Sequence, residues 1–202
     1  QEWHGACSNK PSMSKIIKIL LFCLPLYLGT YQKGYPEEFV PSEGEVSLLE
    51  LINEARKDPL GMAEALGMAR ETVLQNLPQL TDLLTKGLAP LKVDEKLYQA
   101  ALGHTAEMIA NIYYSHVSLD GRTYAERIRE NGYAAVACGE ALGLVAFQNL
   151  MAPEEAARII FASIFRAELD PETTKERNIL NPERTEAGIA LGSGRFTTGG
   201  ST

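Results

Sequence analysis

Two histidines and a glutamate are the side chains best suited to chemistry in this sequence: His104, His116 and Glu140. Most of a predicted helix separates the two histidines, about 13 Å at 1.5 Å per residue. We therefore expect them not to share a metal ion. His104 falls on the apolar stripe of that helix, so we expect a core histidine with one satisfied nitrogen, and it is also a further candidate for the cleft.

His116 follows the same helix and precedes the Asp120-Gly121 turn, where a side chain can face a cleft. The alternative is a histidine that interacts with the dipole at the helix C-terminus. Glu140 follows a glycine, and its alternative is an acid in the first turn of a helix. Spacing alone leaves both alternatives open, and from these residues we predict one His/Glu cleft.

Several sequence signatures of catalysis are absent. The chain has no G-x-S-x-G elbow, no H-E-x-x-H, no P-loop and no C-x-x-C. Its 202 residues carry 26 acidic and 19 basic side chains, a net charge of −7, and 45% hydrophobic residues. This composition predicts one globular domain. It argues against a nucleic-acid partner, because phosphate backbones are bound by concentrated lysine and arginine.

The N-terminal part of the sequence resembles a targeting segment. We interpret residues 1–12 as an upstream leader that precedes Met13, and residues 13–32 as a secretory signal peptide with two lysines before an apolar run. That run is too short to span a bilayer. Residues 33–46 are rich in proline, glycine and acids, as a linker is. The domain is then predicted over 47–202, in a secreted or cell-envelope protein with no transmembrane span in its mature part.

Helices are predicted to position the candidate residues. Apolar spacing and end signals indicate them over 47–58 with Ser47 as the cap, over 61–85, over 95–113, over 124–130, and from Pro153 onward. The last helix is predicted to bury Ala156, Ile159, Ile160, Ser163 and Ile164.

One strand is predicted near the end of the sequence, over 187–191. A lone strand leaves its backbone edges unpaired. Either residues 133–147 supply further strands or the domain continues past Thr202.

The order of several segments resembles a bacterial CAP domain (SCP, or cysteine-rich secretory/antigen 5/pathogenesis-related). The resemblance covers about residues 47–192. It rests on Asn53 with Arg56, on Ser-His, Asp-Gly, Arg and Gly-Tyr in order, on Gly-Glu, and on Asn178-Ile179-Leu180. The segments that carry it are LINEARKDP, PLKVDEKLYQAALGHTAEM, YYSHVSLDGRTYAERIRENGY, CGEAL and ERNILNPERTEAGIAL.

The resemblance implies an α+β fold, an α-β-α sandwich of the CAP type, in a secreted protein. It also implies a central cleft to which His116 and Glu140 contribute. An imidazole and a carboxylate brought together could hold a divalent cation such as zinc or orient a water. Other members of the family bind sterols or fatty acids, cell-wall material or protein partners.

The sequence departs from the family pattern at the cleft. The second cleft histidine is absent, since Thr174 and Lys175 occupy its aligned positions. Glu168 or Glu172 could supply an oxygen ligand in its place, although the spacing requires neither. The final strand of the family is not reached by Thr202, so we expect a sheet truncated at its C-terminal strand.

These departures favour a binding module over an enzyme. We expect a secreted domain that binds an apolar ligand or a lipid, cell-envelope or extracellular partner. The alternative is a metal-assisted hydrolase that uses His116 and Glu140. A catalytic zinc keeps three protein ligands and one open position, and the sequence offers two by name. A helical domain with no cleft is the third possibility.

Overall fold

The computed structural model describes residues 40–147, 151–172 and 177–194, which belong to one unit of the chain, Glu38–Thr202. The predicted leader and signal peptide, residues 33–39 of the linker, and positions 174 and 175 lie outside these residues. The described elements follow the order α1 (Glu43–Lys57), α2 (Pro59–Ala65), α3 (Arg70–Asn76), η1 (Pro78–Leu80), α4 (Thr81–Lys86), β1 (Lys92–Val93), α5 (Glu95–Asn111), α6 (Tyr124–Glu130), α7 (Pro153–Glu168) and β2 (Glu186–Ala187).

Helix α1 begins earlier than the sequence predicts. Ser42, not Ser47, is the N-cap, and it forms a capping box with Glu45 in which each side chain accepts from the other's backbone N–H. The last residues of the predicted linker, 43–46, are therefore helical. The C-terminal end agrees with the prediction, because Asp58 and Pro59 end α1 and begin α2.

The single helix predicted over 61–85 is wrong. The structure divides this segment into α2, α3, η1 and α4. Gly67 adopts a positive φ of 82° after α2, a conformation that ends helices. Pro78 has no backbone N–H to donate and starts the short η1 turn.

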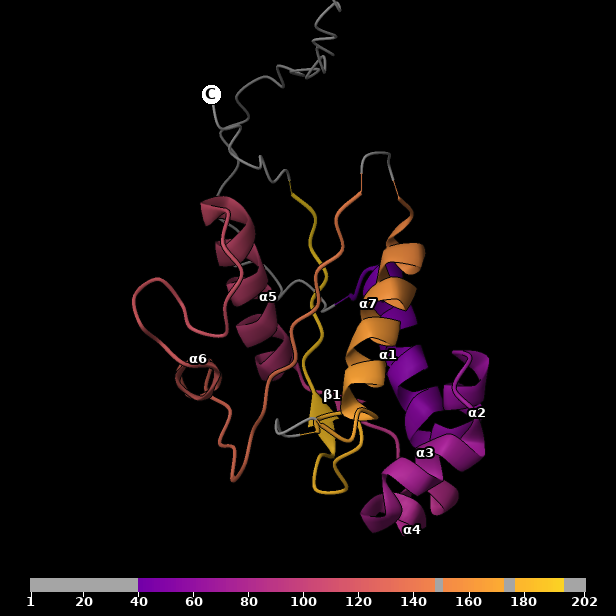
Figure 1. Cartoon of the computed structure of the whole chain (residues 1–202). Helices are drawn as coiled ribbons and strands as arrows, with labels where there is room; N and C mark the ends of the chain where they lie inside the picture. Colours follow the sequence, from indigo (N-terminus) through magenta and orange to yellow (C-terminus); the bar gives the residue numbers. More distant parts are fainter. Residues whose placement is uncertain (1–39, 148–150, 173–176, 195–202) are drawn as a thin grey trace, which may run out of the picture. The chain divides into compact units, whose positions relative to one another are not determined.

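Helices α1 and α7 pack against each other (Figure 1), and they contribute to an apolar core with α2, α3 and α4. The α7 face is turned by about one residue from the predicted one. Ile160 is buried as expected, but Ile159 is 42% exposed. Ala157, Phe161 and Phe165 take the buried positions, and the two phenylalanine rings stack with centroids 5.5 Å apart.

Helices α5 and α6 agree closely with the sequence. Asp94 caps α5 by accepting from the backbone N–H groups of Lys96 and Leu97. Thr123 and Glu126 form a capping box at the start of α6, and α6 ends at Glu130 as predicted. The two helices pack on each other, so residues of both contribute to one polar region.

Both strands are only two residues long, shorter than the one predicted. β1 and β2 pair in parallel, with Lys92 opposite Glu186 and Val93 opposite Ala187. The predicted strand over 187–191 keeps only Ala187, and the amide of Leu191 donates to the Glu45 side chain instead. Within the described part of 133–147, no residue forms a strand. The fold is thus mixed α/β and mostly helical, and the sandwich stays a prediction.

The segment after β2 lies in extended form against helices. A Cβ on Gly188 would collide with the backbone of Leu97 and Tyr98 in α5. Only glycine therefore lets the segment approach the helix so closely. Over the ranges that are described, no helix is both long and apolar enough to cross a membrane.

Candidate functional site

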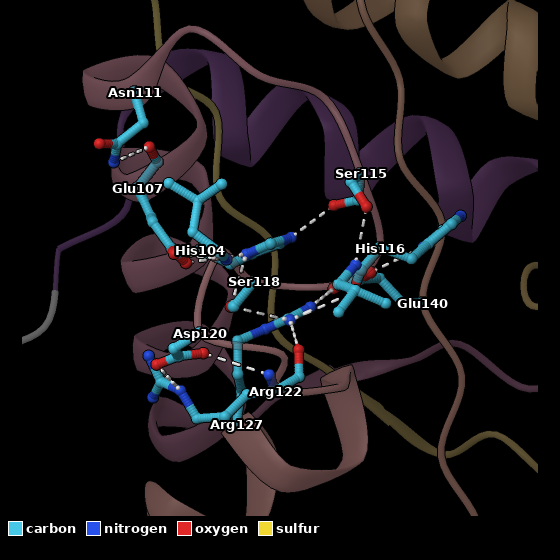
Figure 2. Close-up of polar contacts among 12 residues, drawn as sticks. His104, Glu107, Asn111, Ser115, His116, Ser118, Asp120, Arg122, Arg127 and Glu140 are labelled. Atoms are coloured by element: carbon cyan, nitrogen blue, oxygen red, sulfur yellow. Dashed lines mark hydrogen bonds and ion pairs between the residues drawn. The ribbon is translucent and has the colours of Figure 1, made fainter.

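The structure brings His116 and Glu140 together. The Nδ1 atom of His116 lies 2.7 Å from Oε1 of Glu140. The second carboxylate oxygen of Glu140 accepts from Nη2 of Arg127 at 2.5 Å. Figure 2 shows the Arg127 side chain extending from α6 toward both His116 and Glu140. The His116 side chain is 47% exposed and that of Glu140 is 17% exposed, so the imidazole is the part of this group that solvent reaches most easily.

Arg127 is the buried residue that holds His116 and Glu140 in place. It is buried in the middle of α6, where the Thr123 capping box fixes the start of the helix. Its Nη1 donates to the backbone oxygens of His116 and Arg122 at 3.1 Å each, and to the Ser118 hydroxyl at 3.3 Å. One buried guanidinium thus binds both the backbone beside the histidine and the carboxylate that faces it.

Glu140 is positioned through its backbone as well. Its carbonyl oxygen accepts from the Asn178 side chain at 3.1 Å. A Cβ on the neighbouring Gly139 would lie 2.1 Å from the Asn178 side-chain oxygen, so any larger residue here would displace the Asn178 amide. The Gly-Glu and Asn-Ile-Leu segments noted in the sequence are therefore in direct contact.

His104 is a buried structural histidine, as the sequence predicts. It is 2% exposed. Its Nε2 lies 2.8 Å from the carbonyl oxygen of Ser115, and its Nδ1 lies 3.4 Å from the Ser118 hydroxyl. A carbonyl only accepts, so Nε2 carries the hydrogen. Both ring nitrogens of His104 have a polar partner, whereas we predicted a partner for one nitrogen.

Glu107 also anchors the chain after α5. Its carboxylate accepts from the amide of Leu119 at 3.1 Å and lies 3.5 Å from His104 Nδ1. Burial raises the pKa of this carboxyl, but hydrogen bonds led by those from Ser118 and the Leu119 amide outweigh burial and lower it to about 2. Glu107 is therefore a charged anchor for the segment that carries His116.

Residues 112–119, which we call the His116 segment, expose several apolar side chains from this anchored backbone. Ile112, Tyr114, Val117 and Leu119 are between 44% and 64% exposed. The pKa of Tyr114 is raised by partial burial and then by the charge of Glu140. Tyr114 therefore lies near the His116–Glu140 pair.

The segment begins with a strained residue. Ile112 adopts φ 55° and ψ 50°, the left-handed region, and is 53% exposed. A β-branched residue is rarely found there, and such strain costs about 1–3 kcal/mol. This left-handed conformation ends α5 and directs the chain into the His116 segment. Strained residues of this kind are typical of functional sites.

Two further glutamates were predicted as candidate ligands, and they lie in other surroundings. Glu168 is buried at the end of α7, and its carboxylate accepts from three successive backbone N–H groups, those of Asn178, Ile179 and Leu180, at 2.8 Å each. Burial raises its pKa, against the opposing effect of these hydrogen bonds. Glu172 is exposed, and its amide donates to Asp170.

Asn53 and Arg56 of α1 are structural. The Asn53 amide both donates to and accepts from the backbone of Leu91, at 3.1 and 2.7 Å. Arg56 is 1% exposed. It donates to four backbone carbonyls, those of Ala89, Ile179, Asn181 and Arg184.

A groove of about 390 Å³ lies between α5 and the residues around α6. Its walls are mainly polar, with His104 and Glu107 on one side and Arg122 and Arg127 on the other. Arg122 is already paired with Asp120 and Glu130. The groove therefore does not suit an apolar ligand, and the exposed His116 segment is the apolar surface next to the site.

The described residues do not fit a zinc site. They contain no group of three His, Cys, Asp or Glu side chains arranged to hold a metal ion, whereas a catalytic zinc uses three protein ligands. Both carboxylate oxygens of Glu140 already accept hydrogen bonds, from His116 and from Arg127. The assignment of His116 and Glu140 as metal ligands stays a prediction.

Sequence reasoning did not assign a role to the residues that hold this pair. The family pattern included an arginine between Asp-Gly and Gly-Tyr but did not say which of the arginines there it is, and Ser118 was not singled out. Periodicity placed Arg127 on a short helix, and a buried arginine in such a helix needs acceptors from elsewhere. That requirement is a signal, but it names no partner until the chain is folded.

Comparisons with known proteins add one finding. The family model described as "CAP: Cysteine-rich secretory protein family" matches residues 49–199. The search of the curated proteins and the search of the solved structures each gave no match.

Proposed function

The chain belongs to the CAP (cysteine-rich secretory protein) family, and from that premise we propose that it is an extracellular binding module whose His116 segment contacts a lipid surface. Proteins of this family are in general extracellular modules of a binding type. Secretion of this chain and its lipid partner are our proposals, supported by the predicted signal peptide and by the surface around His116.

The observation that carries the proposal is an exposed apolar segment on an anchored backbone. The segment's backbone is bonded to His104, Arg127 and Glu107. Its four apolar side chains are nevertheless about half exposed. A preorganised segment loses little conformational entropy on binding. Apolar side chains held out in this way indicate contact with an apolar partner.

A lipid surface fits this segment better than a small ligand in a pocket. The groove beside it has polar walls, and small apolar molecules bind in concave apolar sites. Aliphatic side chains with a tyrosine are suited to the boundary between headgroups and acyl chains. The net charge of −7 gives no attraction to anionic lipids, which bind basic segments. A neutral bilayer is therefore the expected partner.

Vesicle co-sedimentation tests the proposal. The chain from residue 33 onward is mixed with phosphatidylcholine vesicles, beside the variants Leu119→Ser and Ile159→Ser. Leu119 belongs to the segment, whereas Ile159 is an exposed apolar side chain of α7. We expect Leu119→Ser to weaken partitioning by roughly tenfold, the equivalent of about 1.5 kcal/mol for a buried leucine. Ile159→Ser should leave partitioning unchanged.

Two outcomes would contradict the proposal. One is no partitioning of the parent chain at any accessible lipid concentration. The other is an equal loss in the two variants, since that would assign binding to general hydrophobicity and not to the segment. Circular dichroism of both variants separates a lost contact from a lost fold.

Binding is preferred to metal-assisted hydrolysis because of the contacts of Glu140. Its carboxylate is bonded to His116 and Arg127, so it is not available to hold a metal without giving up one of them. The hydrolase alternative requires ligands that the described residues do not supply.

A further inference from the structure

We infer that Glu140 and Arg127 fix His116 with its hydrogen on Nδ1, and that the exposed Nε2 acceptor selects lipid headgroups that carry an N–H donor. This inference rests on the proposed lipid-binding function and names the headgroup.

The tautomer follows from the partners of the carboxylate. An ionised carboxylate only accepts hydrogen bonds, so the 2.7 Å contact requires the hydrogen on Nδ1 of His116. Arg127 can only donate, and its Nη2 takes the other oxygen of Glu140. The neutral imidazole then has a lone pair on Nε2 and no hydrogen there.

Nε2 of His116 is the acceptor left for a ligand. Among the described residues, none forms a hydrogen bond with it, and the side chain is 47% exposed. Tyr114 lies near Glu140, and Val117 adjoins His116 in the same exposed segment. An acceptor beside apolar side chains matches an amphiphile whose polar end donates.

The charges around the imidazole select among amphiphiles. The Glu140 carboxylate contacts the ring at Nδ1, and the chain as a whole has a net negative charge. A carboxylate or phosphate monoester headgroup would find no donor at Nε2 and would be repelled. An ammonium with N–H groups offers both a donor and a positive charge. A quaternary ammonium offers the charge without the donor.

A pair of lipids differing by one methyl group isolates the donor. Vesicles of phosphatidyl-N,N-dimethylethanolamine keep one N–H on the headgroup, whereas phosphatidylcholine vesicles have none. We expect the parent chain to prefer the dimethyl lipid by about 3–10-fold, which is what one hydrogen bond contributes. Leu119→Ser should weaken binding to both lipids and keep the preference.

Two variants test the role of the pair. His116→Ala removes the acceptor, so the preference should fall to about one while apolar partitioning remains. In Glu140→Gln, Arg127 donates to the amide oxygen, and the amide NH₂ then faces Nδ1 of His116. That arrangement moves the ring hydrogen to Nε2, and the preference for the N–H lipid should again be lost.

The tautomer can be read without any ligand. Long-range ¹⁵N–¹H correlation in alkaline buffer, where imidazole is neutral, distinguishes a protonated from an unprotonated ring nitrogen. We expect His116 with hydrogen on Nδ1 in the parent chain and on Nε2 in Glu140→Gln. His104, whose Nε2 donates to Ser115, provides the internal reference of the opposite tautomer.

The failures of the two ideas are distinguishable. If the chain binds neither lipid, the proposed function is wrong. If it binds both lipids equally through Leu119, the function stands and the headgroup inference is overturned. Hydrogen on Nε2 of His116 in the parent chain would overturn the inference whatever the vesicles show.

Discussion

Two buried arginines in this domain face carboxylates in different ways. Arg56 donates only to backbone carbonyls, and Glu168 accepts backbone N–H groups of the same Asn-Ile-Leu stretch. Arg127 also donates to backbone oxygens, but its Nη2 is bonded to Glu140, which in turn faces His116. Among the described residues, every hydrogen-bond partner of the Arg56 and Glu168 side chains is main chain, and both charges are buried.

The difference separates architecture from a site. A buried charge that is satisfied by backbone groups fixes the path of the chain and has nothing left for a ligand. The second cluster ends in an imidazole with one nitrogen turned to solvent. Both clusters contain residues of the family pattern, so the motif alone does not tell which residues could act on a partner.

The largest effect is expected at Arg56. Arg56→Met removes the donor of four backbone carbonyls, of which that of Ile179 is fully buried, and a buried group left unpaired costs about 1–3 kcal/mol. We expect a loss of at least about 3 kcal/mol in the free energy of unfolding by urea titration. Arg127→Met should cost less, because Glu140 and His116 reach water. Equal losses would remove the distinction between the two clusters.

The pH dependence of stability should differ in sign between Glu107 and Glu168. The pKa of Glu107 is about 2 in the fold against an ordinary 4.5, so the unfolded chain binds more protons between these values. Its contribution is present above pH 4.5 and is lost as pH falls toward 2. The pKa of Glu168 is raised by burial, so its contribution decreases as pH rises above 4.5.

Urea titrations across this acid range check the sign. Glu107→Gln should flatten the rise of stability between about pH 2 and 4.5. Glu168→Gln should remove a decrease above 4.5. The prediction fails if Glu107→Gln leaves the acid limb of the profile as steep as in the parent chain.

The smallest effect on stability is expected at His116. Its ring is half exposed, and exposed substitutions change stability by about 0.5 kcal/mol or less. His116→Ala should therefore unfold close to the parent chain in urea. His104→Ala is the matched control, because it removes a buried ring bonded to Ser115, and it should cost about 2 kcal/mol or more. A similar cost for both would assign His116 to the core.

Local signals predicted some elements well. The α6 helix matched because Thr123 and Glu126 mark its start and Asn131-Gly132 its end. The prediction of one helix over 61–85 failed because it relied on the spacing of the leucines and gave too little weight to Gly67 and Pro78, which interrupt the helix. The buried face of α7 shifted because Phe161 and Phe165, not the aliphatic residues counted, fill the core.

The candidate site was only partly predictable. The pairing of His116 with Glu140 came from the resemblance, since their spacing in the chain fixes no contact. The hydrogen bonds from Arg127 to His116 and Glu140 could not be predicted, because they depend on how α6 packs against the His116 segment. The strand predicted over 187–191 was too long, because the backbone after Ala187 bonds to a side chain instead, as the Leu191 amide does to Glu45.

Hydrogen–deuterium exchange on vesicles tests the central claim most directly. The chain is compared free and bound to phosphatidyl-N,N-dimethylethanolamine vesicles, with peptides covering residues 112–119 and the Arg56 cluster at 177–184. The account predicts that lipid slows exchange in residues 112–119 and leaves 177–184 unchanged. Protection at 177–184 with none in 112–119 would contradict it, because the lipid contact would then lie on the structural cluster.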